Sequence, residues 1–429
     1  MSLRATQTLS IAVLSLGMLP GWGQIVLPVS HPASQDAGGC PSFNSSIPSA
    51  ASERCTGSQR SGNLLDDGKH FLLSLGSLGG HDSAFNARPN LPASFEGGMV
   101  YAGLMSLKQN SFSLFENTTS WVNYGAAQGI LEYVNSTSLS MTHMHSPRTT
   151  FSFAANNVFG NDAIRILPFT GNDNVEQASY GIHPGRVIDD QATARLSRQS
   201  TETRWWAITV RNNFRDFIDD ASRVNTLHAR AEVQYQPSPR AGIGVFEETS
   251  IETGTVNCTS QSVGLVYERR FSETLAAEVA AAPAVGTKGC IDKVSANLYG
   301  AFSAQPWRAT NLYLSAFRKL NDSGFNAVSY ENNALGGWIQ KFGMHAWSKA
   351  QAGWLSGTAP LHVESFSGTY YSGTFGRALP AGFTAAVTFQ RYNWSGVTNV
   401  APTRTILMGS LNWSPSRYTP EDLHGPMSH

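Results

Sequence analysis

The feature of this sequence that comes closest to a chemical site is a His-x-His pair. His143 and His145 would project from one face of an extended strand, at a separation that allows two imidazoles to share a metal ion. Leu139 and Met141 lie on the same face, which favours the alternative of a polar cuff at a membrane interface. We therefore predict no metal site here and no cofactor.

Three common catalytic signatures are missing from the sequence. It contains no GxSxG elbow, no HExxH and no GxxxxGK followed by Ser or Thr. Ser, His and Asp occur, but no local arrangement of them suggests a lipase or a protease. We predict no catalytic residues and therefore no enzyme, with an outer-membrane hydrolase as a distant alternative.

A set of polar and charged residues recurs at every second position of strand-like segments. Mixed charges on neighbouring strands can create a transverse field that orients polar solutes in a channel. They can equally be present because an enclosed interior must satisfy its own polar groups. The residues that we predict to line such an interior are Arg211, His228, Arg230, Glu232, Gln234, Glu268, Arg270 and Glu278.

These residues belong to segments of alternating apolar and polar residues, joined by connections that are short and long in turn. From Thr226 the chain reads TLHARAEVQYQ, a tight PSPR link, then AGIGVFEETS and a long polar stretch. A period of two over about ten residues gives a strand long enough to cross a bilayer when it is tilted. The pattern predicts an all-β protein, a single transmembrane antiparallel up-and-down β-barrel.

We assign about 18 strands, within a range of about 16 to 18, because an even number returns both termini to the periplasmic side. Short periplasmic turns and long extracellular loops then alternate along the whole chain. The predicted strands are His70–Gly79, Val100–Leu107, Ser111–Thr119, Ser136–His145, Arg148–Val158, Ala192–Gln199, Thr203–Asn213, Val224–Gln236, Arg240–Ser250, Gln261–Arg270, Thr274–Pro283, Val294–Ala304, Arg308–Lys319, Ala334–Gly343, Trp347–Ser356, Glu364–Gly376, Gly382–Asn393 and Pro402–Trp413.

The period of two also predicts which face of each strand meets lipid. In the segment after Thr226, Val233 and Tyr235 share a face with Leu227, while Arg230 and Glu232 lie on the other. A charge at mid-bilayer on the outer face costs several kcal/mol, so the polar face should enclose the lumen. A β-sandwich or a soluble barrel would invert this arrangement, and the alternation alone does not exclude either.

The composition of the chain and the placement of its aromatic residues favour a transmembrane barrel over a β-sandwich or a soluble barrel. Charged residues make up only 14% of the chain and the net charge is zero. A soluble protein normally carries about a quarter charged residues, and a neutral chain gives no reason to expect nucleic acid as a partner. Aromatic residues gather at strand ends, where an interfacial girdle requires them or where they would plug the barrel mouths: Trp307, Trp347, Phe342, Phe271, Trp394 and Trp413.

The ends of the chain predict export and a simple domain order. Residues 1–23 have the charged start, the short apolar run and the small-residue cleavage site of a signal peptide, although an uncleaved anchor is the alternative. Residues 24–69 are rich in Pro, Ser and Gly and predict a flexible periplasmic leader. The barrel should span residues 70–415, followed by a polar tail at residues 416–429.

Four cysteines in an exported chain favour disulfides over a metal site. Cys40 and Cys55 share the leader, and Cys258 and Cys290 fall in consecutive long loops on one side of the membrane. We predict the pairs Cys40–Cys55 and Cys258–Cys290, with free or mispaired thiols as the alternative.

Two stretches carry a family resemblance. SVGLVYERRFSETLAAEVA and TAAVTFQRYNW, together with the SPR-type turns, resemble the large uncharacterised outer-membrane β-barrel families of Gram-negative bacteria. The resemblance covers most of the chain from His70 and implies porin-like transport or exopolysaccharide export. The chain departs from common barrels because a polar tail follows Trp413.

Two functions are consistent with these observations. The first is an outer-membrane channel for small hydrophilic solutes or an exported polysaccharide, with outer-membrane lipid as the other partner. The second is a structural or surface-display barrel with a blocked lumen, whose extracellular loops bind a partner. The loop 159–190 and the leader before His70 are the two segments that could fill the lumen. The sequence does not indicate an oligomeric state.

Overall fold

The computed structural model describes most of the chain between Gly68 and Pro415. The predicted signal peptide, nearly all of the leader, the polar tail and the Cys40–Cys55 pair lie outside the described residues. The described ranges are 68–84, 91–108, 110–124, 130–146, 148–161, 186–218, 222–238, 240–254, 257–272, 274–287, 290, 293–307, 310–322, 328–343, 345–358, 365–396 and 401–415.

The described residues form 18 β-strands, together with a 3-10 turn at Pro380–Gly382 between the sixteenth and the seventeenth. The strands are β1 Gly68–Asp82, β2 Ala93–Lys108, β3 Ser111–Tyr124, β4 Ile130–Ser146, β5 Thr149–Asn161, β6 Arg186–Gln199, β7 Arg204–Phe217, β8 Ser222–Ser238, β9 Ala241–Gly254, β10 Cys258–Ser272, β11 Leu275–Gly286, β12 Val294–Trp307, β13 Thr310–Asp322, β14 Val328–Phe342, β15 Ala346–Thr358, β16 Ser365–Ala378, β17 Phe383–Ser395 and β18 Thr403–Trp413.

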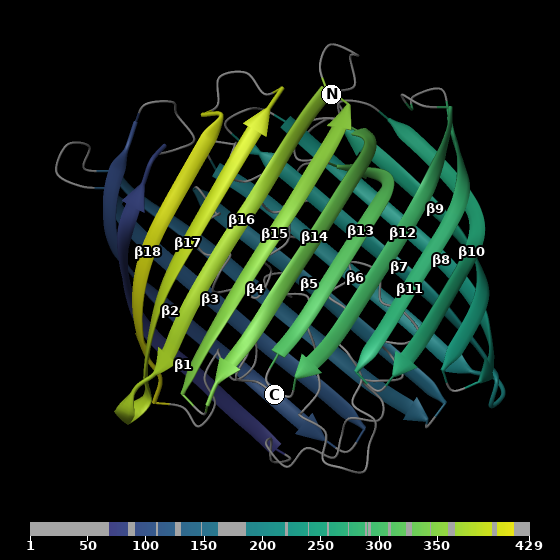
Figure 1. Cartoon of the computed structure of the whole chain (residues 1–429), viewed down its shortest axis with the longest axis horizontal. Coiled ribbons are helices and arrows are strands. Elements are labelled where there is room, and N and C mark those ends of the chain that lie inside the picture. Colours follow the sequence, from purple (N-terminus) through teal and green to yellow (C-terminus); the bar gives the residue numbers. More distant parts are fainter. Residues whose placement is uncertain are drawn as a thin grey trace, which may run out of the picture.

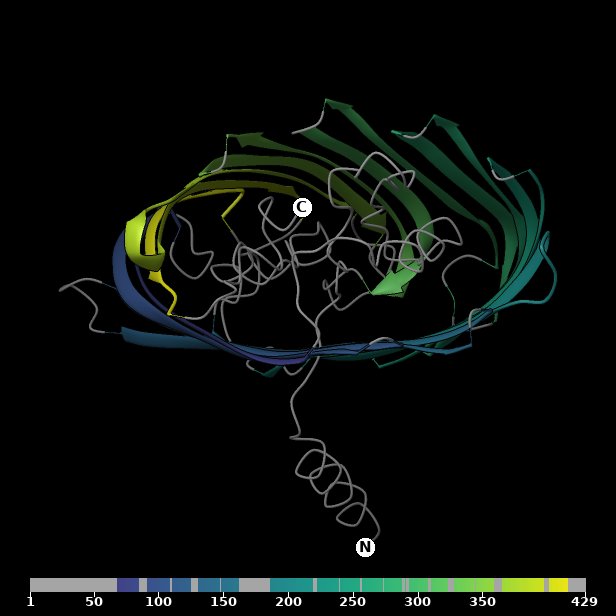
Figure 2. The same cartoon turned by 90° about the horizontal axis from the view of Figure 1, so that it is seen from below.

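Each strand pairs antiparallel with its neighbours in sequence, and β1 pairs with β18 to close the ring. At the closing seam, Leu75 lies opposite Trp413 and Asp82 lies opposite Ile406. Figure 1 shows the tilted strands from the side, and Figure 2 shows a flattened ring from below. The predicted closed 18-stranded up-and-down barrel is confirmed.

The strands are longer than predicted, mainly at the ends that adjoin the long loops. β2 begins at Ala93 instead of Val100, β4 at Ile130 instead of Ser136, and β6 at Arg186 instead of Ala192. Backbone pairing continues in these segments although the apolar alternation fades. Above the hydrocarbon layer the outer face no longer needs apolar side chains, so the sequence pattern ends before the hydrogen-bonded ladder does.

Side-chain exposure shows an inside-out distribution. On β8, Val233 is 54% and Tyr235 47% exposed on the outer face, whereas the inward Arg230 is 7% and Glu232 6% exposed. β17 repeats the pattern, with Val387 exposed and Gln390 buried. This is the opposite of a β-sandwich or a soluble barrel and suits a wall surrounded by lipid tails. Among the described residues, no helix is long and apolar enough to cross a membrane.

Two of the six aromatics that we predicted for the interfacial girdle lie inside the barrel. Trp307 is 70% exposed, but Trp347 and Trp394 are 8% and 7% exposed. A Cβ on Gly368 would lie 2.1 Å from the Trp394 ring, so only glycine leaves room for this close approach on the inner face. Strand parity, rather than position at a strand end, determines the direction in which these two rings point.

Candidate functional site

The interior of the barrel is divided into two parts. β8 and β13 are separated by four strands in the sheet, yet some of their Cα atoms lie within 8 Å of each other. The wall formed by β8 to β13 therefore folds back on itself and makes a narrow lobe, which we call the packed lobe. The remaining strands, β1–β7 and β14–β18, enclose the rest of the interior, which we call the wide compartment.

An apolar layer fills the middle of the packed lobe. It contains Phe246, Val266, Ala280, Ala282, Tyr299 and Ala301, with Phe317 packed against it. These side chains come from β9 to β13 and point inward, where a water-filled pore would require polar groups. Close packing of this kind excludes water and stabilises the lobe as an ordinary protein core does.

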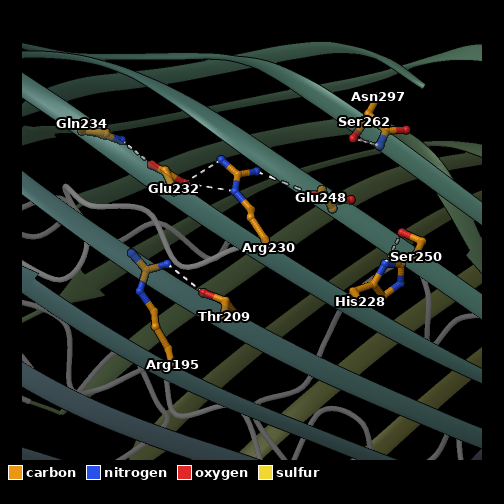
Figure 3. A network of polar contacts seen from close by, with 10 residues as sticks. All are labelled: Arg195, Thr209, His228, Arg230, Glu232, Gln234, Glu248, Ser250, Ser262 and Asn297. Carbon is orange, nitrogen blue, oxygen red and sulfur yellow. Dashed lines mark hydrogen bonds and ion pairs between the residues drawn. The ribbon is translucent and has the colours of Figure 1, made fainter. Parts of the chain in front are cut away.

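A network of charged groups lies next to that apolar layer (Figure 3). Arg230 on β8 donates to Glu232 with Nη2 at 2.7 Å and Nε at 3.0 Å from Oε2, and its Nη1 lies 3.8 Å from Glu248 on β9. Gln234 donates to the second oxygen of Glu232 at 2.5 Å. The Arg230 guanidinium also lies 4.0 Å from the centre of the Phe246 ring.

The other predicted interior residues lie around this network. His228 Nδ1 is 2.7 Å from Ser250 Oγ. The charge of Lys319 on β13 acts on this imidazole across the lobe, and that of Arg211 acts from the neighbouring strand β7. Arg211 pairs with His228 in the ladder between β7 and β8, and it is buried.

The remaining predicted residues lie on β10 and β11. Glu268 lies directly opposite Glu278 in the ladder between these strands, and both carboxylates are buried, while Arg270 is half-buried. All eight predicted residues are thus on the inner side. That they line a solute path stays a prediction.

The sequence reasoning missed several charged residues of the wide compartment. Asp189 and Arg215, on β6 and β7, form an ion pair of 3.2 Å in which both side chains are 1% exposed. Arg195 on β6 donates to Thr209 and lies 5.7 Å from the Trp205 ring. Asp189 and Arg215 were missed because they lie beyond the predicted strand ends, where Arg215 continues the inward parity of Arg211. Arg195 lies within a predicted strand, and its inward parity would have identified it.

An acidic group on the first strands adds to this compartment. Glu116 on β3 accepts hydrogen bonds from Tyr101 at 2.6 Å and from Ser138 at 2.9 Å. It faces inward among Thr118, Ser120 and other hydroxyl side chains that are buried. The inner surface of β3 to β7 is therefore mostly polar in its middle, in contrast with the apolar middle of the packed lobe, while an apolar cluster that includes Val122, Val134 and Phe217 lies toward the loop ends.

A buried ion pair also holds the seam where the ring closes. Arg404 on β18 donates to Asp82 on β1 with Nε 3.1 Å from both carboxylate oxygens and Nη2 2.5 Å from Oδ2. Neither side chain is more than 1% exposed. A bidentate pair of this kind ties the two ends of the sheet together with defined geometry.

A disulfide joins two extracellular segments above the packed lobe. Cys258 is the first residue of β10, and Cys290 lies in the connection between β11 and β12, with their Cα atoms 4.7 Å apart. The predicted Cys258–Cys290 bridge is confirmed. The Cys290 sulfur lies 3.4 Å from the carbonyl oxygen of Thr259, so the bridge packs against the strand that it anchors.

The His-x-His pair lies at the turn end of β4. His143 and His145 are both exposed on the outer face. Within the described ranges there is no group of three or more potential ligands that could hold a metal ion.

Comparison with known proteins adds a likeness of architecture. No family model matches the chain, and no curated protein matches it either. Pseudomonas aeruginosa OpdK, solved with vanillate, aligns over 81% of this chain and 98% of its own at 8% identity and a TM-score of 0.41. A BenF-like porin from Pseudomonas fluorescens aligns over 82% of this chain and all of its own, at 9% identity and a TM-score of 0.42.

A third solved structure, the FrpB iron transporter of Neisseria meningitidis, aligns over 77% of this chain and 63% of its own at 11% identity and a TM-score of 0.37. Likenesses this distant carry no argument about function, so the assignment rests on the closed ring and its exposed apolar face. The chain is an outer-membrane β-barrel.

Proposed function

We propose that the chain forms a porin-like channel for small hydrophilic solutes, and that the path runs through the wide compartment. The observation that carries this proposal is the different lining of the two parts. The packed lobe is filled by an apolar layer. Along β3 to β7 the middle of the inner wall carries mainly hydroxyls, amides and charges, and apolar side chains such as Val122, Val134 and Phe217 lie toward the loop ends of these strands. A polar inner wall with fixed charges is what passage of hydrated solutes requires.

The charges of the wide compartment are unevenly distributed, which supports a role in orienting solutes. Arg195, Arg211 and Arg215 lie on the adjacent strands β6 and β7, where Asp189 pairs with Arg215 and leaves an excess of positive charge, while the buried acids Glu116 and Glu132 lie on β3 and β4. Basic and acidic groups on separate stretches of one wall create a field along which a dipolar solute aligns. An exported polysaccharide would use the same polar surface.

One observation favours a second candidate, a surface-display barrel with a blocked lumen. The inward Glu116, Arg211 and Arg215 are each no more than 8% exposed, so the inner wall is largely shielded from water in this conformation. In this alternative the extracellular loops would bind a partner and the polar interior would serve stability alone.

Planar-bilayer recordings of the refolded full chain test the proposal. We expect discrete current steps, and we expect Arg211→Glu to shift the reversal potential in a salt gradient toward cations. A variant lacking residues 24–67, which precede β1, shows whether the leader limits the current. No current in either protein, with the folded barrel confirmed by heat-dependent gel mobility, would remove the channel function and leave the display function.

A further inference from the structure

The outer face of β3 to β6 carries a polar strip where lipid tails should meet apolar side chains. Asn117, Thr137, Asn157 and Asp190 lie in one cross-strand row, each opposite the next in the ladder. Thr119 and Asn135 form a second pair beside that row. We call these six residues the polar strip. Their alternation with buried inward neighbours, such as Glu116 and Ser136, places them on the outside.

Apolar residues border the polar strip on both sides, so it does not simply belong to the extracellular rim. On the loop side, Trp121 lies opposite Tyr133, and these side chains are 42% and 45% exposed. The Tyr133 ring packs on Phe159 with centroids 5.7 Å apart. On the turn side, Phe115 lies opposite Leu139. The polar strip is therefore enclosed within the apolar outer surface.

Four members of the polar strip hydrogen-bond to one another in a nearly symmetric way. Asn117 Nδ2 donates to Thr137 at 2.8 Å, and Asn135 Nδ2 donates to Thr119 at 2.8 Å. The two amides also exchange hydrogen bonds of 3.3 Å in both directions. These bonds lower the cost of placing amides in a membrane, but they leave a surface of groups that both donate and accept.

Asp190 has a weaker set of partners. Among the described residues, its only hydrogen-bond donor is Asn157, on the neighbouring strand. Ile188 and Ala192 are the adjacent outward positions on β6, and the opposite outward residue on β7 is Phe214. A carboxyl group in such a place is costly unless a further polar group meets it, so ionisable residues at lipid-facing positions point to a partner.

The shape of the wall indicates which partner. Figure 2 shows that the purple and blue strands, β1 to β5, run along a nearly straight side of the ring, whereas the teal-to-yellow strands curve. Two copies related by a two-fold axis along the membrane normal would touch over several strands on the straight side. That symmetry keeps every residue at its own depth, so the polar strip of one copy meets that of the other.

We propose that the polar strip is the contact surface of a homodimer within the membrane. Amides and hydroxyls suit this role because they are self-complementary, whereas a surface of one charge sign would repel its copy. Asp190 lies at one edge of the strip and Asn117 at the other, so the two-fold axis brings the carboxyl of one copy toward the amide side of its partner. The partner's amide and hydroxyl groups then supply the donors that a lipid tail lacks.

Cross-linking in vesicles tests this contact directly. Thr137→Cys places a thiol near the middle of the strip, and oxidation should give a covalent dimer. Val263→Cys is the matched control, because Val263 is 64% exposed on the outer face of β10. The parent protein, with its native cysteines, sets the background. The proposal is overturned if Thr137→Cys cross-links no more than Val263→Cys.

Removal of the polar groups gives an independent measurement. We expect the double variant Asn117→Leu, Asn135→Leu to remain folded in lipid, with a dimer dissociation constant raised roughly tenfold or more. Asn393→Leu is the control, since Asn393 is an outer-face amide on the curved side that donates to Thr369 at 3.0 Å. Unchanged dimerisation of the double variant would contradict the proposal. So would a monomer in which bound outer-leaflet glycolipid shields the Thr137→Cys thiol from maleimide, because lipid would then occupy the strip.

Discussion

The packed lobe and the wide compartment are built from the same kind of strand, yet their interiors differ. In the packed lobe, β8 and β13 approach each other and an apolar layer with an Arg230-centred network fills the space. Along β3 to β7 the middle of the inner surface is mainly polar, and apolar side chains lie toward the loop ends of these strands. The comparison teaches that the inside of a barrel can be partly a protein core and partly a lining, and that inward charge alone does not mark a pore.

The Arg230 network should show the largest effect on stability. Arg230→Ala leaves the carboxylates of Glu232 and Glu248 buried without their cation, and losing one partner of a buried ion pair costs about 3–5 kcal/mol. Denaturant-dependent unfolding in lipid measures the loss. The control is Arg223→Ala, whose 2.8 Å pair with Asp216 has the arginine 68% exposed and should cost at most about 1 kcal/mol. Equal losses would show that the lobe is not the tightly packed part.

For the apolar layer of the packed lobe we expect a loss of stability that is similar to that of Arg230→Ala or slightly smaller. Phe246→Ala should destabilise the barrel by about 3–5 kcal/mol, because it removes a buried ring from the layer and from contact with Arg230. Phe246→Leu keeps most of the volume and should cost less than about 1.5 kcal/mol. The same recordings that measure conductance should find both variants unchanged. A large conductance change with little loss of stability would place the solute path in the lobe instead.

For the disulfide above the packed lobe we expect a smaller effect on stability. Replacing Cys258 and Cys290 together by Ser should lower the free energy of unfolding by roughly 2–4 kcal/mol, because the bridge closes a long segment of the unfolded chain. Thermal unfolding with and without reductant checks this value. The double-Ser variant should no longer respond to reductant, and a reductant effect that persists in it would trace to other cysteines.

For a residue of the wide compartment we expect the reverse: a small loss of stability and a clear change in ion selectivity. Glu116→Gln keeps a carbonyl oxygen for Tyr101 or Ser138, so the expected cost is only about 1 kcal/mol. Loss of one negative charge should shift the reversal potential toward anions. If Glu116→Gln leaves selectivity unchanged while Arg230→Ala alters it, the assignment of the two regions is the wrong way round.

Much of the candidate site followed from local alternation. The inward direction of Arg230, Glu232 and Glu278 was predictable because side chains of a strand alternate between faces, whatever the rest of the fold does. Asp189 and Arg215 were missed because pairing extends past the point where the outer face stops being apolar. The polar strip was not predicted either. Strands were recognised by an apolar outer face, and Asn117 and Thr137 interrupt that face.

The sequence by itself determined the number of strands, their order, the face that meets lipid and the Cys258–Cys290 pairing, because each depends on period-two alternation or on the order of loops along the chain. Only the tertiary structure decided that β8 folds against β13, that Trp347 and Trp394 point inward, and that one wall is straight. These features depend on the cross-section of the closed ring. That cross-section is set by packing between strands far apart in the sequence, which no local pattern records.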